Sequence, residues 1–267
     1  MCRHLAYLGQ ECSPSEAVFT APHSLLVQSY APKDMRYGGT VNADGFGLGW
    51  FAGDGVPVRY RRSSPLWTDT DLPRIAETVR ARTFVAAVRS GTTGMPVTDA
   101  ACAPFADERW LFSHNGVVRG WPGSVAGLAE KLAVTDLLGL EAPTDSALLW
   151  ALVRDRLRGG ADPVDVVAGL VTDVARAAPG SRLNLLLAGE DLLVGTAWTH
   201  ALSVRATAGS VLLASEPPDD TAGWRPVPDR HLVVARRGDP PTVDITPLDT
   251  PHDSAGDSAS DDDRSQA

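Results

Sequence analysis

The sequence has 267 residues, of which 43% are hydrophobic and 21% are charged, and its formal net charge is −9. This composition is typical of a globular protein with material for one large domain or two small ones. The absence of any run of about 18 apolar residues excludes a membrane-spanning helix, and the acidic balance argues against a nucleic-acid partner, which requires a basic surface.

The number of cysteines and the composition of the N-terminal stretch indicate the cellular compartment. Three cysteines, Cys2, Cys12 and Cys102, are too few for a disulfide framework. No basic region followed by a long apolar core marks a secretory signal, so we expect a cytoplasmic protein with reduced thiols. No second Cys/His pair has the spacing of a metal site, so we expect neither a metal nor another cofactor.

The first half of the chain predicts short strands bounded by turn residues. These lie at residues 5–9, 45–52, 56–62, 83–90 and 110–116. Helical spacing of apolar residues occupies 71–82, and a second short helix is expected at 124–134. The glycine-rich start of the strand at 45–52 is followed by no helix, so it does not fit a dinucleotide-binding loop.

Two longer helices follow, each with start and stop signals. The helix at 143–160 has Thr144 in the N-cap position and stops at a Gly-Gly pair. The helix at 162–180 has Asp162 as its cap, a proline in its first turn and a glycine at its end.

The second half returns to predicted strands, at residues 182–190, 192–200, 201–209, 210–216, 231–239 and 242–248. Strands, then helices, then strands, without regular alternation, predict an α+β protein with antiparallel sheets and helices grouped outside them. Towards the C-terminus the composition changes to Asp, Ser, Gly and Pro. We therefore expect one domain over 2–249 and a disordered acidic tail over 250–267.

Cys2 is the first candidate catalytic residue. Removal of Met1 would leave a thiol and a free α-amine on one residue. The amine has an ordinary pKa of about 7.7–8.0, so it can take the thiol proton near neutral pH. The alternative is that Cys2 is a small buried residue at the head of the first strand.

The stretch Ser-His-Asn-Gly at 113–116 ends a predicted strand. Asn-Gly is a common hairpin turn. The side-chain amide of Asn115 and the backbone N–H of Gly116 could instead donate to a tetrahedral oxyanion. Glycine also lets the backbone approach a ligand closely. Both interpretations are open at this point.

Three further residues are candidates for holding the ends of an amino-acid substrate. The Arg89 guanidinium can bind a carboxylate through two parallel hydrogen bonds, with the Thr92 hydroxyl beside it, and Asp145 can hold an α-ammonium. The alternatives are a surface ion pair for Arg89 and a helix-start charge for Asp145. With Cys2, this set fits a γ-glutamyl group, whose side-chain amide the thiol would attack.

Five pieces in this order resemble the class II glutamine amidotransferases, a branch of the N-terminal nucleophile hydrolases: Cys2, residues 42–47, Arg89 with Thr92, residues 114–116 and residues 144–146. The resemblance covers most of residues 2–250. It implies a four-layer αββα sandwich of two antiparallel sheets. It also implies the roles of the site residues: Cys2 as nucleophile, Asn115 and Gly116 as oxyanion hole, and Arg89 and Asp145 as partners of the glutamyl head.

One stretch departs from the family pattern. Many members carry Arg-Gly-Tyr-Asp before the glycines, whereas residues 41–44 are Val-Asn-Ala-Asp. The role of that arginine is therefore not supplied at the same position, and we do not assign it to the upstream Arg36.

Residues 22–51 and 214–234 resemble a narrower group, the γ-glutamyl amidohydrolases of ergothioneine biosynthesis. This resemblance implies a small-molecule substrate, γ-glutamyl-hercynylcysteine sulfoxide, cleaved without metal or partner chain. Trp67, Trp121 and Trp224 lie in predicted loops and are candidates for its trimethylammonium group, with Trp224 favoured because two acids lie close to it. The alternatives are a glutaminase subunit that supplies ammonia to a separate synthetase, and a non-catalytic member. A homo-oligomer is compatible with the sequence.

Overall fold

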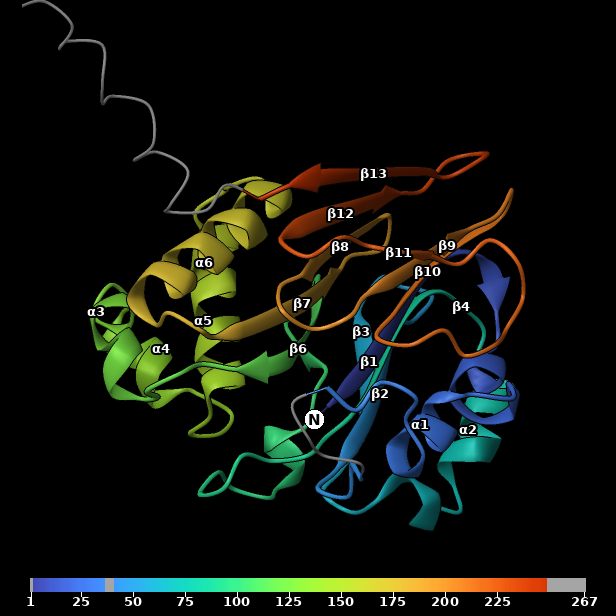
Figure 1. Cartoon of the computed structure of the whole chain (residues 1–267), viewed down its shortest axis with the longest axis horizontal. Coiled ribbons are helices and arrows are strands. Elements are labelled where there is room, and N and C mark those ends of the chain that lie inside the picture. The colour runs from blue at the N-terminus through green and yellow to red at the C-terminus, as the bar shows by residue number, and fades with distance from the viewer. Residues whose placement is uncertain (1, 37–40, 249–267) are drawn as a thin grey trace, which may run out of the picture.

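The computed structural model describes residues 2–36 and 41–248. Within these ranges, two antiparallel sheets lie face to face, and helices cover the outer face of each (Figure 1). This arrangement confirms the predicted α+β class and the four-layer αββα sandwich. The predicted tail at 250–267 lies outside the described residues, and the domain boundary at 249 stays a prediction.

The first sheet has the strand order β11-β9-β10-β1-β4-β2-β3. Its strands are β1 (Arg3–Cys12), β2 (Phe46–Phe51), β3 (Pro57–Arg62), β4 (Ala81–Val88), β9 (Ser203–Ala206), β10 (Ser210–Ala214) and β11 (Arg225–Pro226). The first strand of the chain is central, because β1 pairs with β4 on one edge and with β10 on the other. Arg3 lies opposite Val88, so β1 begins where β4 ends.

The second sheet has the strand order β13-β12-β8-β7-β6-β5. Its strands are β5 (Phe105–Ala106), β6 (Leu111–Val117), β7 (Arg182–Ala188), β8 (Leu192–Ala197), β12 (His231–Arg236) and β13 (Thr242–Pro247). The β7–β8 hairpin turns at the Ala-Gly-Glu-Asp stretch, where the Gly189 N–H donates to the Leu192 carbonyl at 2.9 Å. The strands predicted at 182–190 and 192–200 are therefore joined by a tight turn and pair with each other.

The helices form the two outer layers (Figure 1). The second sheet is covered by α3 (Ala126–Ala129), α4 (Val134–Leu138), α5 (Asp145–Arg158) and α6 (Pro163–Ala177), and the first by α1 (Leu25–Tyr30), α2 (Leu72–Thr78) and a π-helical turn (Glu16–Thr20). Single 3-10 turns lie at Leu66–Thr68, Asp99–Ala101 and Gly123–Val125.

Two helix predictions are wrong in extent. The helix predicted at 71–82 ends at Thr78, because the chain from Ala81 onward pairs as β4 in the middle of the first sheet. Of the helix predicted at 124–134, α3 forms Ala126–Ala129, and α4 begins at the last predicted residue, Val134, after the extended backbone of Ala133.

The central strands bury both faces, which explains their continuous apolar runs. In β7, Leu183, Leu185 and Leu187 pack under the helices of the second sheet. The alternate residues Leu186 and Ala188 face the first sheet. Because successive side chains point to opposite faces of a strand, one run of leucines supplies two separate hydrophobic layers.

Both long helices begin at the predicted capping residues. Thr144 Oγ1 accepts a hydrogen bond from the Ala147 N–H at 3.2 Å, and Asp162 Oδ1 accepts one from the Val164 N–H at 2.8 Å. These bonds satisfy backbone donors that the first turn of a helix cannot satisfy itself. The helix starts are therefore determined locally.

We expect Asp162→Ala to lower the free energy of unfolding by about 1 kcal/mol, because the cap of α6 is lost. The measurement is the urea midpoint at an unchanged m value. Asp165→Ala is the matched control in the same helical turn. Its lost dipole interaction of about 0.3–1 kcal/mol is offset by the roughly 0.7 kcal/mol better helix propensity of alanine. Equal losses in both variants would contradict the capping role.

Candidate active site

A cleft of about 350 Å³ opens at the edge of the sandwich where β1 begins and β4 ends. Its polar lining residues come from both sheets and from the start of α5: Cys2, Arg3, Arg89, Ser113, His114 and Ser146. The structure therefore brings two of the predicted site residues, Cys2 and Arg89, into one cleft.

The Cys2 thiol is held by the residue that follows Arg89. The Ser90 N–H donates to Cys2 Sγ at 3.5 Å, and Sγ lies 3.6 Å from the Ser90 carbonyl oxygen. Cys2 is partly exposed. Neither group of Ser90 is a base, so the proton of the thiol must be taken by another group.

Asn115 and Gly116 lie inside β6 and not in a turn. Asn115 is opposite Asn184 and Gly116 is opposite Leu183 in β7, so the hairpin interpretation of Asn-Gly is wrong. A Cβ atom at Gly116 would lie 1.9 Å from the Arg182 carbonyl oxygen. Glycine is therefore required by the close approach of β7, a packing reason that the sequence did not reveal.

The Asn115 side chain is buried and oriented by a serine from the other sheet. Its Nδ2 donates to Ser215 Oγ at 3.1 Å, and the same oxygen accepts from the His4 N–H at 3.1 Å. A primary amide carries two N–H donors, and this bond uses one of them. Sequence reasoning missed Ser215, because a serine inside a predicted strand carries no signal of this contact.

Arg89 has a guanidinium that lines the cleft. Its Nη1 lies 3.5 Å from the Asp44 carbonyl oxygen, and no ion pair with a carboxylate is found within residues 2–36 and 41–248. The described residues therefore do not support the interpretation of Arg89 as a surface ion-pair residue. Thr92 is exposed and does not line the cleft, so the structure does not bring the two together.

Asp145 joins α5 to the end of β6. Its Oδ2 accepts from the Val118 N–H at 3.0 Å and its Oδ1 from the Ser146 N–H at 2.7 Å. Asp145 is buried, and its neighbour Ser146 is the residue of α5 that lines the cleft. The Ser146 hydroxyl lies 3.0 Å from His114 Nδ1. These two contacts therefore support the interpretation of Asp145 as a residue that stabilises the start of the helix.

The stretch that departs from the family pattern supports the backbone beside Arg89. Asp44 Oδ2 accepts from the Gly91 N–H at 2.8 Å, and Asn42 Nδ2 donates to the Gln28 carbonyl at 3.4 Å. Arg36 is paired with Asp34, with 2.8 Å between Nε and Oδ2. The side chains of this region thus fix loops around the cleft.

Two buried histidines lie beside this region in the neutral state. Burial, reinforced by nearby positive charges, lowers the pKa of His4 to about 3 and that of His200 to about 3. His4 Nδ1 lies 3.0 Å from Ser113 Oγ and so joins the two sheets. Groups with so low a pKa are weak bases, and we assign them no proton transfer.

The glycine-rich strand β2 supports one wall of the cleft. A Cβ at Gly47 would lie 2.3 Å from the Ala103 carbonyl oxygen, and one at Gly49 would lie 2.7 Å from Pro104 Cγ. The glycines therefore let this segment lie directly on the sheet, where Ala103 and Phe105 line the cleft. Their role is packing, in agreement with the rejection of a phosphate-binding loop.

The three loop tryptophans do not line the cleft. The Trp224 indole N–H donates to Asp219 Oδ1 at 3.0 Å, and the Arg205 guanidinium lies over its ring. Trp121 packs against the helical core, whereas Trp67 is 42% exposed. The preference for Trp224 is thus not supported, because protein groups already occupy its ring and its N–H.

The described part of the chain holds no group of three or more His, Cys, Asp or Glu side chains placed to bind a metal ion. None of its helices combines the length and hydropathy needed to cross a bilayer.

Residues 21–204 match the family of class II glutamine amidotransferases. The chain belongs to this family. The matched range contains Arg89, Asn115, Gly116 and Asp145, and it begins after Cys2.

Among individual proteins, the chain is 41% identical over 248 residues to the gamma-glutamyl-hercynylcysteine sulfoxide hydrolase of Mycolicibacterium smegmatis, covering 93% of this chain and 100% of that protein. It is 40% identical over 250 residues to the protein of the same name from Mycobacterium tuberculosis (strain CDC 1551 / Oshkosh), covering 93% and 97%. A class II glutamine aminotransferase domain protein from Silicibacter pomeroyi has a similar structure, with a TM-score of 0.65, 21% identity and coverage of 93% and 100%. The Bacillus subtilis glutamine phosphoribosylpyrophosphate amidotransferase gives a TM-score of 0.67 at 12% identity, with coverage of 93% and 49%. These two structures share the fold.

We expect iodoacetamide to modify Cys2 before Cys102 in the folded protein at about pH 8. Cys102 is fully buried, and burial raises the pKa of its thiol to about 11, so little thiolate is present. Burial also raises the pKa of Cys12. Peptide mass spectrometry after a timed exposure gives the modified fraction of each cysteine, with Cys2→Ala as control. Faster modification of Cys102 would contradict the assignment of Cys2 to an accessible cleft.

Proposed function

We propose that this protein is an amidohydrolase that cleaves the γ-glutamyl amide of γ-glutamyl-hercynylcysteine sulfoxide in ergothioneine biosynthesis, releasing glutamate and hercynylcysteine sulfoxide. The observation that carries the proposal is a partly exposed thiol, Cys2, in one cleft with Arg89, an arginine that has no carboxylate partner among the described residues. The 41% identity to a hydrolase named for this substrate, over 93% of the chain, supports the choice of substrate.

In the proposed reaction, removal of Met1 gives Cys2 a free α-amine. The amine takes the thiol proton, and the thiolate attacks the γ-carbonyl carbon. The C–N bond breaks as the proton passes to the leaving amine, which leaves a γ-glutamyl thioester on Cys2. A water molecule then adds to the thioester carbonyl, the C–S bond breaks, and glutamate is released.

Asn115 and Gly116 are the proposed oxyanion donors. One N–H of the Asn115 amide donates to Ser215 Oγ, so the other can donate to the negative charge that develops on the substrate oxygen. A donor fixed before the reaction needs no reorganisation when that charge appears. The buried position of Asn115 supports this role, because a hydrogen bond is stronger where water is excluded.

Arg89 and Asp145 are the proposed partners of the glutamyl head. The Arg89 guanidinium faces the cleft and matches the two oxygens of an α-carboxylate. The Asp145 carboxylate accepts two backbone N–H bonds and can still accept from an α-ammonium. We propose that this chemistry takes place in the cytoplasm, where free cysteines such as these remain reduced.

The substrate is tested by kcat/KM for γ-glutamyl-hercynylcysteine sulfoxide and for glutamine, measured side by side on the purified protein. Glutamine lacks the hercynyl portion, and binding energy from such a remote portion raises transition-state stabilisation. We expect a preference of about 10²-fold or more for the larger substrate, without ATP or added metal. Equal or better hydrolysis of glutamine, with activity rising on addition of a synthetase, would favour an ammonia-supplying glutaminase instead.

We expect Asn115→Ala to lower kcat by about 10²–10³-fold with a smaller change in KM, because the lost donor acts mainly in the transition state. The control is Asn184→Ala, on the facing position of β7, whose side chain bonds to backbone groups of residues 198–201 within the described part of the chain. It should reduce stability and leave the kcat of the folded enzyme near wild type. A rise in KM at unchanged kcat in Asn115→Ala would contradict the proposal that Asn115 is an oxyanion donor.

A further inference from the structure

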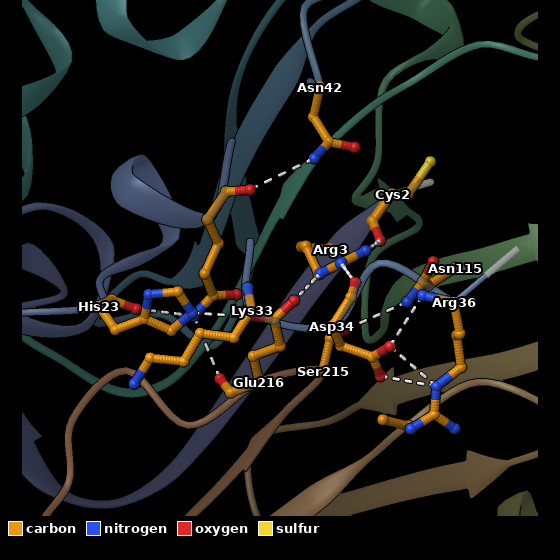
Figure 2. Close-up of polar contacts among 12 residues, drawn as sticks. Cys2, Arg3, His23, Lys33, Asp34, Arg36, Asn42, Asn115, Ser215 and Glu216 are labelled. Atoms are coloured by element: carbon orange, nitrogen blue, oxygen red, sulfur yellow. Dashed lines mark hydrogen bonds and ion pairs between the residues drawn. The ribbon is translucent and has the colours of Figure 1, made fainter. Parts of the chain in front are cut away.

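We propose that Arg3 is the residue that positions Cys2 for catalysis, and that Glu216 holds Arg3 in place. The inference rests on the proposed function, because it concerns the nucleophile of that reaction. Figure 2 shows Arg3 between Cys2 and Glu216.

Arg3 is a buried charge with defined contacts. Its side chain is 2% exposed, its Nε lies 2.5 Å from Glu216 Oε1, and its Nη1 donates to the Cys2 carbonyl oxygen at 2.9 Å (Figure 2). Its Nη2 donates to the Asp34 carbonyl. A planar guanidinium can make these bonds at once, whereas an ammonium group cannot match the same geometry.

Glu216 is itself fixed from several sides. Its Oε2 accepts from His23 Nε2 at 2.6 Å and from the Lys33 N–H at 2.8 Å, and its carbonyl oxygen accepts from Gln28 Nε2 at 3.1 Å. Burial alone would raise the pKa of Glu216, but the His23 hydrogen bond and the Arg3 charge outweigh it and hold the pKa below its ordinary value. An ionised, immobile carboxylate therefore anchors the guanidinium.

These contacts determine where the two reactive groups of an N-terminal cysteine lie. Such a residue has no preceding peptide to hold it, so its amine and thiol move together about the Cα–C bond. Arg3 holds the Cys2 carbonyl, and the Ser90 N–H holds Cys2 Sγ. With these two points fixed, the position of the α-amine relative to the thiol follows. Misplacement of a reacting group by about 1 Å can cost about 10²-fold in rate.

A purely structural role for Arg3, joining β1 to β10 and to the loop at 33–36, would lower stability and leave Cys2 in place in the folded enzyme.

The test uses Arg3→Met/Glu216→Gln, which removes both charges and leaves no unpaired buried ion. We expect kcat to fall by about 10²-fold, with KM changing by less than about threefold. A second readout needs no γ-glutamyl substrate: the rate of Cys2 alkylation by iodoacetamide at about pH 8, followed by mass spectrometry. This rate should fall by about threefold or more, because the proposed base, the α-amine, is no longer held beside the thiol.

Two further variants complete the test. Arg156→Met/Asp173→Asn removes an ion pair of the same type between α5 and α6, with 2.7 Å between Nη2 and Oδ2, and should change neither readout. Arg3→Lys keeps the charge and loses the guanidinium fork, so kcat should fall by about tenfold or more. If the double variant does not fold, Arg3→Lys provides the test instead.

A folded Arg3→Met/Glu216→Gln with wild-type kcat and alkylation rate would overturn the proposal. So would a loss of kcat at an unchanged alkylation rate, which would show a structural role alone. In the absence of a folded double variant, wild-type kcat in Arg3→Lys would overturn it. A wild-type protein that fails to hydrolyse the substrate, together with a reduced alkylation rate in the variant, would overturn the proposed function and leave the positioning role standing.

Discussion

The pairing of β1 on both of its edges is the interaction on which the candidate site depends. The end of a chain frays unless the fold ties it down, and here the first strand lies between β4 and β10 in the middle of a seven-stranded sheet. Cys2 directly precedes that strand and takes its position from it. The Arg3–Glu216 ion pair extends this anchoring beyond the last pair of the strand ladder. A reactive group at a chain end thus acquires the rigidity of a core residue.

The two sheets meet at the site through buried polar bonds. His4 joins β1 to Ser113 of β6, and Asn115 of β6 joins Ser215, which follows β10. Hydrophobic packing is non-directional and tolerates small sliding of the layers, whereas hydrogen bonds between buried neutral groups set a definite spacing and angle. The apolar core therefore makes the sandwich, and these few bonds fix the relative positions of the proposed nucleophile, Cys2, and the proposed oxyanion donor, Asn115.

Local signals in the sequence were sufficient for the layers and insufficient for the polar contacts of the site. The caps Thr144 and Asp162 act on N–H groups a few residues away, so the two long helices were predictable. The contacts of Asn115 with Ser215 and of Arg3 with Glu216 join positions 100 and 213 residues apart. No periodicity reports a partner at such a separation. For the same reason the sequence could not distinguish a turn from a strand at Asn115-Gly116, or show that Trp224 already had partners.

The central position of β1 has a consequence for the order in which the protein is made. The strand needs both β4 and β10, and β10 follows it by roughly 200 residues, which a ribosome takes on the order of 10–40 s to add. During that interval one edge of β1 has no native partner, and the sheet cannot close over the start of the chain. A peptidase that removes Met1, as the proposed reaction requires, would therefore have access to the chain before its first strand is fixed. Exposure of the proposed nucleophile and its immobilisation would in this way be separated in time by strand order alone.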